Sequence, residues 1–464
     1  MTNRSDVPPW VKLGLTAAVL LAAATSGFFL LHPERAPEPV ASLVENLTGA
    51  NPHPVKLLRP PVARLSALAQ LGKQIFFDPS LSASGQQSCA SCHSPQHAYG
   101  PPNDLPVQIG GPHLDDKGFR PPPSLTYLYR QQPFSIGPDL ADVDAPTPLN
   151  QTADQARGTT RSAKVAGVIP AAPAIVPQGG LFWDGRRDTL QMQADGPMTN
   201  PVEMANANLD VVAQKLIRAK YSSQFKPLFG SMILDHPSFL VSEAMSAVAR
   251  YQIEERSFHA FDSKYDAWLE GKARLSPAEL RGLRLFNDKD KANCAGCHPS
   301  KAGADGLPPL FTDTQYEALG VPRNTVLPAN RDAKWFDMGI CGPFRTDLAK
   351  QTQYCGMFLT PTLRNSATRK VFFHNGYYHS LDQVLAFYNF RDTRPERIYP
   401  TNSAKAADKF NDLPSQYHAN IDVADGPFNR KLGEAPAMSN RDMADIVAFI
   451  RTLNDGYGHV GSQY

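Results

Sequence analysis

The sequence has few charged residues, few cysteines and almost no excess of either charge. Charged residues make up 19% of the 464 residues, and the formal net charge is +2, so a basic nucleic-acid-binding surface is not expected. Six cysteines are too few for a disulfide scaffold of this length. Hydrophobic residues, at 42%, are sufficient for a folded core and exclude a disordered chain. A chain of this length predicts two domains.

Proline is abundant, with 42 residues against 32 glycines. This composition predicts long ordered loops between short helices and excludes a continuous coiled coil. No stretch has a convincing strand pattern, whereas several have helical apolar spacing. We expect helices within residues 62–77, 209–229, 238–257, 276–286, 381–388 and 440–453. The expected fold class is therefore all-α.

The N-terminus has the pattern of an export segment. Residues 13–31 carry no charge, and Arg4 and Lys12 precede them. A basic flank followed by an apolar run places the rest of the chain outside the cytoplasm. Because the run is long enough to span a bilayer, we expect an uncleaved membrane anchor in residues 1–35, with cleavage near residues 24–27 as the alternative. In a bacterium the destination is the periplasm, where disulfides form.

The same unit, a helix followed by Cys-x-x-Cys-His, occurs twice. The two motifs comprise Cys89, Cys92 and His93, and then Cys294, Cys297 and His298. This motif is the attachment site of c-type haem: the thiols form thioethers to the haem, and the adjacent histidine binds the iron. A zinc site assembled from the two cysteine pairs is the alternative, but it leaves both histidines without a role. We predict two covalent haems with His93 and His298 as proximal ligands.

The repetition of this unit predicts two similar domains, each wrapping one haem with long loops. We expect a linker in residues 36–60, an N-terminal domain in 61–245 and a C-terminal domain in 246–464. The second axial ligand of each iron then decides function, because a haem with one protein ligand has an open position where a small molecule can bind.

Several short motifs lie outside the haem-binding sequences. They are Phe-Trp-Asp-Gly-Arg in 182–186, Gln193, Gly-Pro in 196–197, the segment 200–204, Pro-Thr-Leu-Arg-Asn in 361–365 and Phe-His-Asn-Gly in 373–376. These motifs resemble the bacterial di-haem cytochrome c peroxidase and MauG family, and the resemblance covers roughly residues 60–455. It implies two cytochrome c-like domains, with peroxide reacting at the N-terminal haem.

The resemblance also implies catalytic roles for four residues. Trp183 matches a tryptophan that lies between the two haems; a packed core tryptophan is the alternative. Gln193 would orient bound peroxide, and Pro197 would line the same pocket. Glu203, ten residues after Gln193, would move a proton between the peroxide oxygens, and its alternative is a solvated loop carboxylate.

The distal ligand of the first haem is left open between two possibilities. In the peroxidase branch of the family, a histidine seven residues before an arginine closes the resting site. His113 precedes Arg120 by seven residues, which makes it a candidate ligand. The loop around it is more similar to MauG-like relatives, in which the site is open, and His113 would then be a surface residue.

The distal ligand of the second haem is expected to be Tyr388. The family ligand follows the histidine of Phe-His-x-Gly by fourteen residues, and fourteen residues after His374 is Tyr388. The alternatives are Met438, Met357 and a Tyr388 that is only packed. A phenolate would stabilise the oxidised iron relative to the reduced iron, whereas methionine does the opposite.

Two further features concern calcium and the remaining cysteines. The family holds a calcium ion between the haems through an asparagine, whose position here is Pro121; Arg369 and Val371 also depart from the pattern. Calcium is therefore an open expectation. Cys341 and Cys355 lie outside the haem motifs, and in an exported chain they predict a disulfide, with two free thiols as the alternative.

Together, the motifs imply a di-haem c-type peroxidase that reduces hydrogen peroxide through high-valent iron, with electrons relayed by the second haem and Trp183. The donor would be a small c-type cytochrome, a cupredoxin or an oxidisable protein. MauG-like oxidative modification of a partner protein is one alternative, and a non-catalytic di-haem electron carrier is another. Gln193 and Glu203 argue against the carrier, which needs no acid/base pair. The expected location is the periplasm, anchored to the inner membrane.

Overall fold

The computed structural model describes residues 38–138, 175–401 and 406–458. Across these residues the protein is mostly helical, as expected, with three two-stranded antiparallel sheets whose strands have only two to four residues. No helix in these residues is long and apolar enough to cross a membrane. The export segment expected in residues 1–35 lies outside the described residues.

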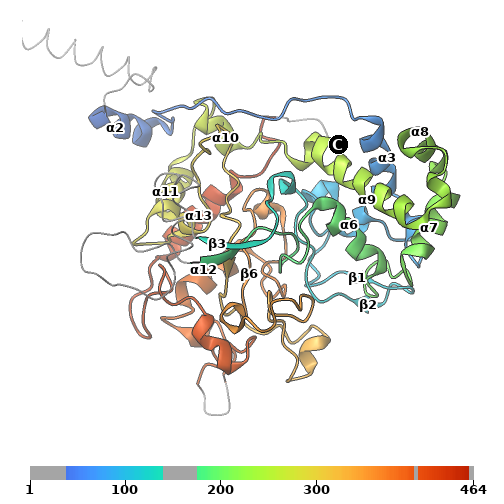
Figure 1. Ribbon diagram of the computed structural model, residues 1–464. Coiled ribbons are helices and arrows are strands. Elements are labelled where there is room, and N and C mark those ends of the chain that lie inside the picture. Colours follow the sequence, from blue (N-terminus) through green and yellow to red (C-terminus); the bar gives the residue numbers. More distant parts are fainter. Residues whose placement is uncertain (1–37, 139–174, 402–405, 459–464) are drawn as a thin grey trace, which may run out of the picture.

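The first half of the chain is built around one long helix, α9 (Pro237–Glu254). Three helices pack directly on it, and they stand together on the right of Figure 1: α3 (Ala67–Phe76), α6 (Leu190–Thr199) and α7 (Leu209–Arg218). The short α8 (Phe225–Phe229) follows α7. Their apolar faces share one core, which includes Leu71, Phe76, Val212, Leu240 and Tyr251. These helices enclose the first Cys-x-x-Cys-His motif, whose cysteines bound the single-turn helix α4 (Cys89–Cys92).

The second half repeats this plan with its own helices. They are α10 (Lys264–Leu269), α11 (Pro277–Asn287), α12 (Leu381–Phe390) and α13 (Asn440–Arg451). The main pair is α11 with α13. The expected cap of the helix before the second haem motif is confirmed: the Ser276 side chain accepts from the Glu279 backbone N–H, and the Glu279 carboxylate accepts from the Ser276 N–H.

A glycine at each helix crossing lets the two backbones touch. A Cβ at Gly72 on α3 would lie 1.8 Å from the carbonyl oxygen of Ala247 on α9, and one at Gly282 on α11 would lie 1.9 Å from that of Asp445 on α13. Both distances are shorter than any real contact, so only glycine fits. In both halves this crossing brings the helix that precedes the haem motif against the last helix of its bundle.

Two boundaries differ from those that the sequence suggested. The expected division at 245/246 falls inside α9, whose buried residues continue to Gln252. The expected linker 36–60 contains α2 (Glu38–Thr48), which buries Ala41 and Val44. After α2 the chain runs along the top of Figure 1 from the second bundle to α3.

The three small sheets lie in the long loops. They pair β1 (Ile109–Gly110) with β2 (Asp116–Lys117), β3 (Ser135–Pro138) with β4 (Ile175–Gln178), and β5 (Tyr316–Glu317) with β6 (Phe358–Leu359). A single bridge joins Gln178 to Gln315, so the sheets β3–β4 and β5–β6 connect the two halves. Just after β4, the chain enters the Phe-Trp-Asp-Gly-Arg motif.

Candidate functional site

The two haem-motif histidines have the same geometry. His93 Nδ1 lies 3.0 Å from the carbonyl oxygen of Tyr99, and His298 Nδ1 lies 2.8 Å from that of Phe311. Each Nδ1–H donates to a backbone carbonyl, so Nε2 is the ring nitrogen left to bind a metal. Burial lowers the pKa of both imidazoles to about 4, and both are therefore neutral, as iron ligation requires.

Each motif lines its own cavity. The first cavity is lined by Cys89, Cys92 and His93, and the second by Cys294, Cys297 and His298. All four cysteines are free thiols in this structure. No group of three or more His, Cys, Asp or Glu side chains that could hold a metal ion occurs in the described part of the chain, so the four-cysteine zinc alternative is wrong. A paired thiol set and a neutral histidine beside a largely apolar cavity fit one covalent haem per half.

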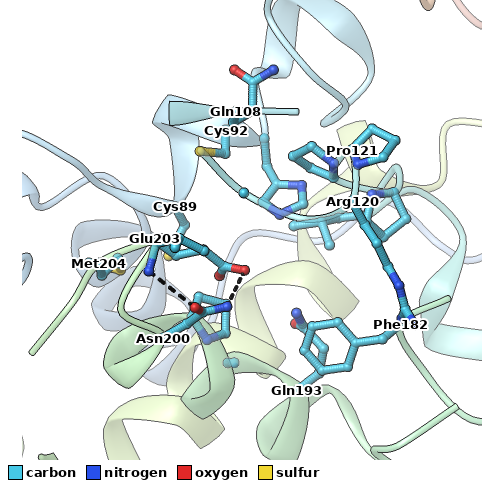
Figure 2. Close-up of a pocket in the computed structure, with 18 of the residues that line it drawn as sticks. Cys89, Cys92, Gln108, Arg120, Pro121, Phe182, Gln193, Asn200, Glu203 and Met204 are labelled. Atoms are coloured by element: carbon cyan, nitrogen blue, oxygen red, sulfur yellow. Dashed lines mark hydrogen bonds between the residues drawn. The ribbon is translucent and has the colours of Figure 1, made fainter. Parts of the chain in front are cut away.

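The four residues expected to act on peroxide all line the first cavity. Gln193 and Pro197 come from α6, Glu203 from the turn that follows it, and Trp183 from the loop that precedes it. Figure 2 shows Glu203 and Asn200 joined by two hydrogen bonds: Asn200 Nδ2 donates to Glu203 Oε1 at 2.7 Å, and the Glu203 N–H donates to the Asn200 carbonyl at 3.0 Å. The Glu203 carboxylate is thus fixed in one orientation.

Burial controls the electrostatics of Glu203. It raises the pKa of the carboxyl above its ordinary value, while the charge of Arg186 and the hydrogen bond from Asn200 act in the opposite direction. Arg186 is held in place because it stacks 3.7 Å above the Phe182 ring and pairs with Asp184 at 2.9 Å. A carboxyl whose pKa is raised in this way inside a cavity is a candidate for taking up and releasing a proton.

Trp183 forms a wall that the first and second cavities share. Its Nε1–H donates to the Pro121 carbonyl at 2.9 Å, and its own carbonyl accepts from the Leu359 N–H at 2.9 Å. Pro121 belongs to the first half and Leu359 to the second, so the indole is held by the first half and the backbone of Trp183 by the second. The role of Trp183 between the two haems stays a prediction, which this position supports.

The structure does not bring His113 to the first cavity. The residue is exposed, in the turn between β1 and β2, and it does not line the cavity. The base of this hairpin is tied to the catalytic turn, since the Gly111 N–H donates to the Glu203 carbonyl at 2.9 Å. The hairpin therefore carries its tip away from the cavity in this structure, and His113 as a ligand of the first haem stays a prediction.

Tyr388 and Met438 both line the second cavity, whereas Met357 does not. Tyr388 is on α12, and its ring stacks on Phe428 with a centroid separation of 5.3 Å. Burial raises the pKa of its phenol, so iron would be needed to ionise it. Met438 is buried, and its backbone is tied to Asn389 by hydrogen bonds in both directions.

A buried ion-pair network joins the walls of the two cavities. Arg120 lines the first cavity and pairs with Asp184 at 2.8 Å and with Asp337, which lines the second cavity, at 2.7 Å. The second cavity also holds His374, whose Nε2 lies 3.3 Å from Asp412. Sequence reasoning did not find Asp337 or Asp412, because each lies far along the chain from its partner and belongs to no local motif.

The expected disulfide between Cys341 and Cys355 is confirmed, and both cysteines are buried. The loop that it closes reaches back to the first half: Arg345 Nη1 donates to the carbonyl oxygens of Asp184 and Gly185 at 3.1 and 3.0 Å. Phe344, from the same loop, lines the first cavity. The second half thus supplies part of the first cavity's wall. The Pro121 carbonyl already accepts a hydrogen bond from Trp183. Whether calcium binds between the haems stays an open expectation.

Fold and site together define a protein with two c-type haem sites that share a tryptophan wall. The sequence profile described as di-haem cytochrome c peroxidase matches residues 66–274. The methylamine utilization protein MauG of Paracoccus denitrificans is 31% identical over 405 residues, which cover 84% of this chain and 89% of that protein. The cytochrome c551 peroxidase of Nitrosomonas europaea is 28% identical over 337 residues, covering 72% and 75%.

Among solved structures, the di-haem peroxidase BthA of Burkholderia thailandensis is 36% identical, with a TM-score of 0.71 and coverage of 85% of this chain and 87% of that chain. The chain therefore belongs to the di-haem cytochrome c peroxidase and MauG family, and it is an enzyme of the cytochrome c peroxidase kind. A non-catalytic electron carrier, one of the alternatives left by the sequence, does not agree with this membership.

Proposed function

We propose that the protein reduces hydrogen peroxide at the first cavity, with electrons that enter at the second cavity and pass Trp183. One observation carries this proposal: Gln193 and Glu203 line the cavity of His93 but not that of His298, while Trp183 lines both. An acid/base pair beside only one haem site assigns peroxide to that site. The other site is left for electron transfer.

A haem held at the His93 site would bind peroxide, and the two haem irons together would supply the two electrons. The chain's own contribution is to move protons: Glu203 takes the proton of the peroxide oxygen nearer the iron and gives it to the outer oxygen, which leaves as water. Asn200 keeps Glu203 Oε1 in place for both steps. The buried Gln193 amide orients the peroxide. Overall, hydrogen peroxide, two electrons and two protons give two waters.

The donor in this proposal is a small c-type cytochrome or a cupredoxin in the periplasm, because the reaction needs two single-electron deliveries per peroxide. A relative named cytochrome c551 peroxidase supports a cytochrome donor. Membrane anchorage stays a proposal that rests on the sequence of residues 1–35 alone.

A second candidate function is oxidation of a partner protein, which the resemblance to the MauG branch of the family implies; a MauG protein is among the relatives. Tyr388 on the wall of the second cavity favours it. A phenolate ligand would stabilise oxidised iron at the His298 site, and such a site suits the removal of electrons from a protein surface better than the storage of donor electrons.

The relay can be tested with Trp183→Phe and a matched control, Trp268→Phe. Trp268 also donates its Nε1–H to a backbone carbonyl, that of Gly49 at 3.0 Å, but it lines neither cavity. We expect Trp183→Phe to keep the rapid reaction of peroxide with the enzyme and to lose at least about tenfold in turnover with a reduced donor, a change of about 1.4 kcal/mol. Equal turnover in the two variants would refute the relay.

A further inference from the structure

Arg369 is a partly buried arginine that has no acidic partner in the described residues. Its Nη2 donates to the Pro122 carbonyl at 3.1 Å and its Nε to the Val371 carbonyl at 3.4 Å. None of the ion pairs formed by the described residues includes it. Burial lowers the pKa of this guanidinium to about 10, which is the effect of removing a cation from water with nothing to compensate it.

Three arginines whose side chains are buried show what is missing. Arg120 pairs with two aspartates, Arg364 with Asp266 at 2.7 Å, and Arg391 with an aspartate at 2.7 Å. A charge that is taken out of water without a partner destabilises the folded protein. Backbone carbonyls offset only part of that cost, so the site around Arg369 lacks an anion that the chain itself does not supply within the described residues.

The cavities next to Arg369 indicate which group could supply that anion. Although it belongs to the second half of the chain, Arg369 lines a third cavity together with His97 and Trp183. Pro122, whose carbonyl it contacts, lines the first cavity. The guanidinium therefore lies beside the first haem site.

The backbone leaves room for this guanidinium. A Cβ at Gly100 would lie 3.2 Å from Arg369 Nη1, closer than most side-chain contacts, so a larger residue at position 100 would crowd it. Gly100 directly follows Tyr99, whose carbonyl orients His93. The same short segment thus positions both the iron ligand and the guanidinium.

We propose that Arg369 binds a propionate carboxylate of the haem attached at Cys89 and Cys92. Haem carries two propionates on the edge away from its thioether bonds, and a guanidinium is the side chain best matched to a carboxylate. The second half of the chain would thereby hold the cofactor of the first half. This proposal rests on the presence of the first haem but not on peroxide reduction, so either can fail without the other.

Removing this cation should lower the reduction potential of the His93 haem, because a nearby positive charge stabilises ferrous iron relative to ferric iron. The test is spectroelectrochemistry of the holoenzyme carrying Arg369→Met or Arg369→Lys. The control is Lys370→Met, which removes the same charge from an exposed neighbour. The thioether bonds retain the haem in every variant, so its loss cannot be mistaken for the effect.

We expect Arg369→Met to lower the midpoint potential of the His93 haem by more than that of the His298 haem, and Arg369→Lys to restore part of the difference. Lys370→Met should move neither potential noticeably. The propionate bending band in the resonance Raman spectrum should also shift in Arg369→Met and stay unchanged in Lys370→Met.

Three outcomes would overturn the proposal. One is an equal, small shift of potential in Arg369→Met and Lys370→Met. Another is a larger shift at the His298 haem, which would assign the guanidinium to the other cofactor. The third is a parent potential that depends on added phosphate or chloride, with the dependence abolished in Arg369→Met, since the anion would then be a free ion.

Discussion

Replacing Glu203 by glutamine should remove most of the peroxide reaction and leave the protein otherwise intact. Glutamine has the same shape and can still form a hydrogen bond with Asn200, which now donates to Glu203 Oε1 at 2.7 Å. It cannot carry the proton between the two peroxide oxygens. A general acid/base typically contributes about 10²–10⁴-fold, which corresponds to about 2.7–5.5 kcal/mol in the activation barrier.

The role of Glu203 also predicts how the rate of the peroxide reaction changes with pH. Burial raises the pKa of Glu203 above the ordinary value of 4.5. Below that raised pKa the carboxyl is protonated and cannot accept the peroxide proton, so the rate in the parent should fall as the pH is lowered through it. The glutamine variant should be slow at every pH and show no such decline.

The assay is stopped-flow mixing of the holoenzyme with peroxide across a pH series. Asp195→Asn is the matched control, because Asp195 is a carboxylate on α6, two residues after Gln193, that does not line the first cavity. It should react like the parent. If Glu203→Gln stays within a few-fold of the parent, or keeps the parent's decline at low pH, the role assigned to Glu203 is wrong.

Three other predictions concern the second half of the chain. Tyr388→Phe should convert the His298 haem from low-spin to high-spin in ferric EPR and raise its reduction potential. An unchanged ferric spectrum would instead favour Met438 as the ligand, and Met438→Ala should then alter that spectrum. Cys341→Ser with Cys355→Ser should lower the unfolding free energy by about 3 kcal/mol on the chain-entropy estimate, measured by denaturant titration, and an unchanged midpoint would show that the closed loop adds nothing. Arg364→Met should cost about 3–5 kcal/mol, seen as a lowered melting temperature, because it leaves a fully buried aspartate without its partner.

The sequence was most informative where the signal is local. The helix starting after Ser276 was predicted with its cap, because a capping box lies within four residues. The two haem motifs are equally local, and the structure adds a shared detail: each histidine donates to a backbone carbonyl. The family motif predicted that Gln193 and Glu203 act together, and both line the first cavity although ten residues separate them.

Contacts between residues that are far apart in the sequence could not be predicted from local motifs. Arg120 pairs with Asp337, which lies 217 positions further along the chain. No sequence motif around either residue predicts this pairing. The direction of the β1–β2 hairpin, which takes His113 away from the haem site, depends on a backbone contact with the Glu203 turn. The boundary at 245/246 lies inside α9, although the apolar spacing within 238–257 already predicted a helix there.

The central claim is that peroxide reacts at an open His93 site with Glu203 as its proton carrier. The most direct measurement is rapid mixing of one equivalent of hydrogen peroxide with the fully ferric enzyme, followed at the Soret band. The account predicts a fast Soret change in the parent that slows by about 100-fold or more in Glu203→Gln. A parent that shows no fast change, as a pure electron carrier would, contradicts the account.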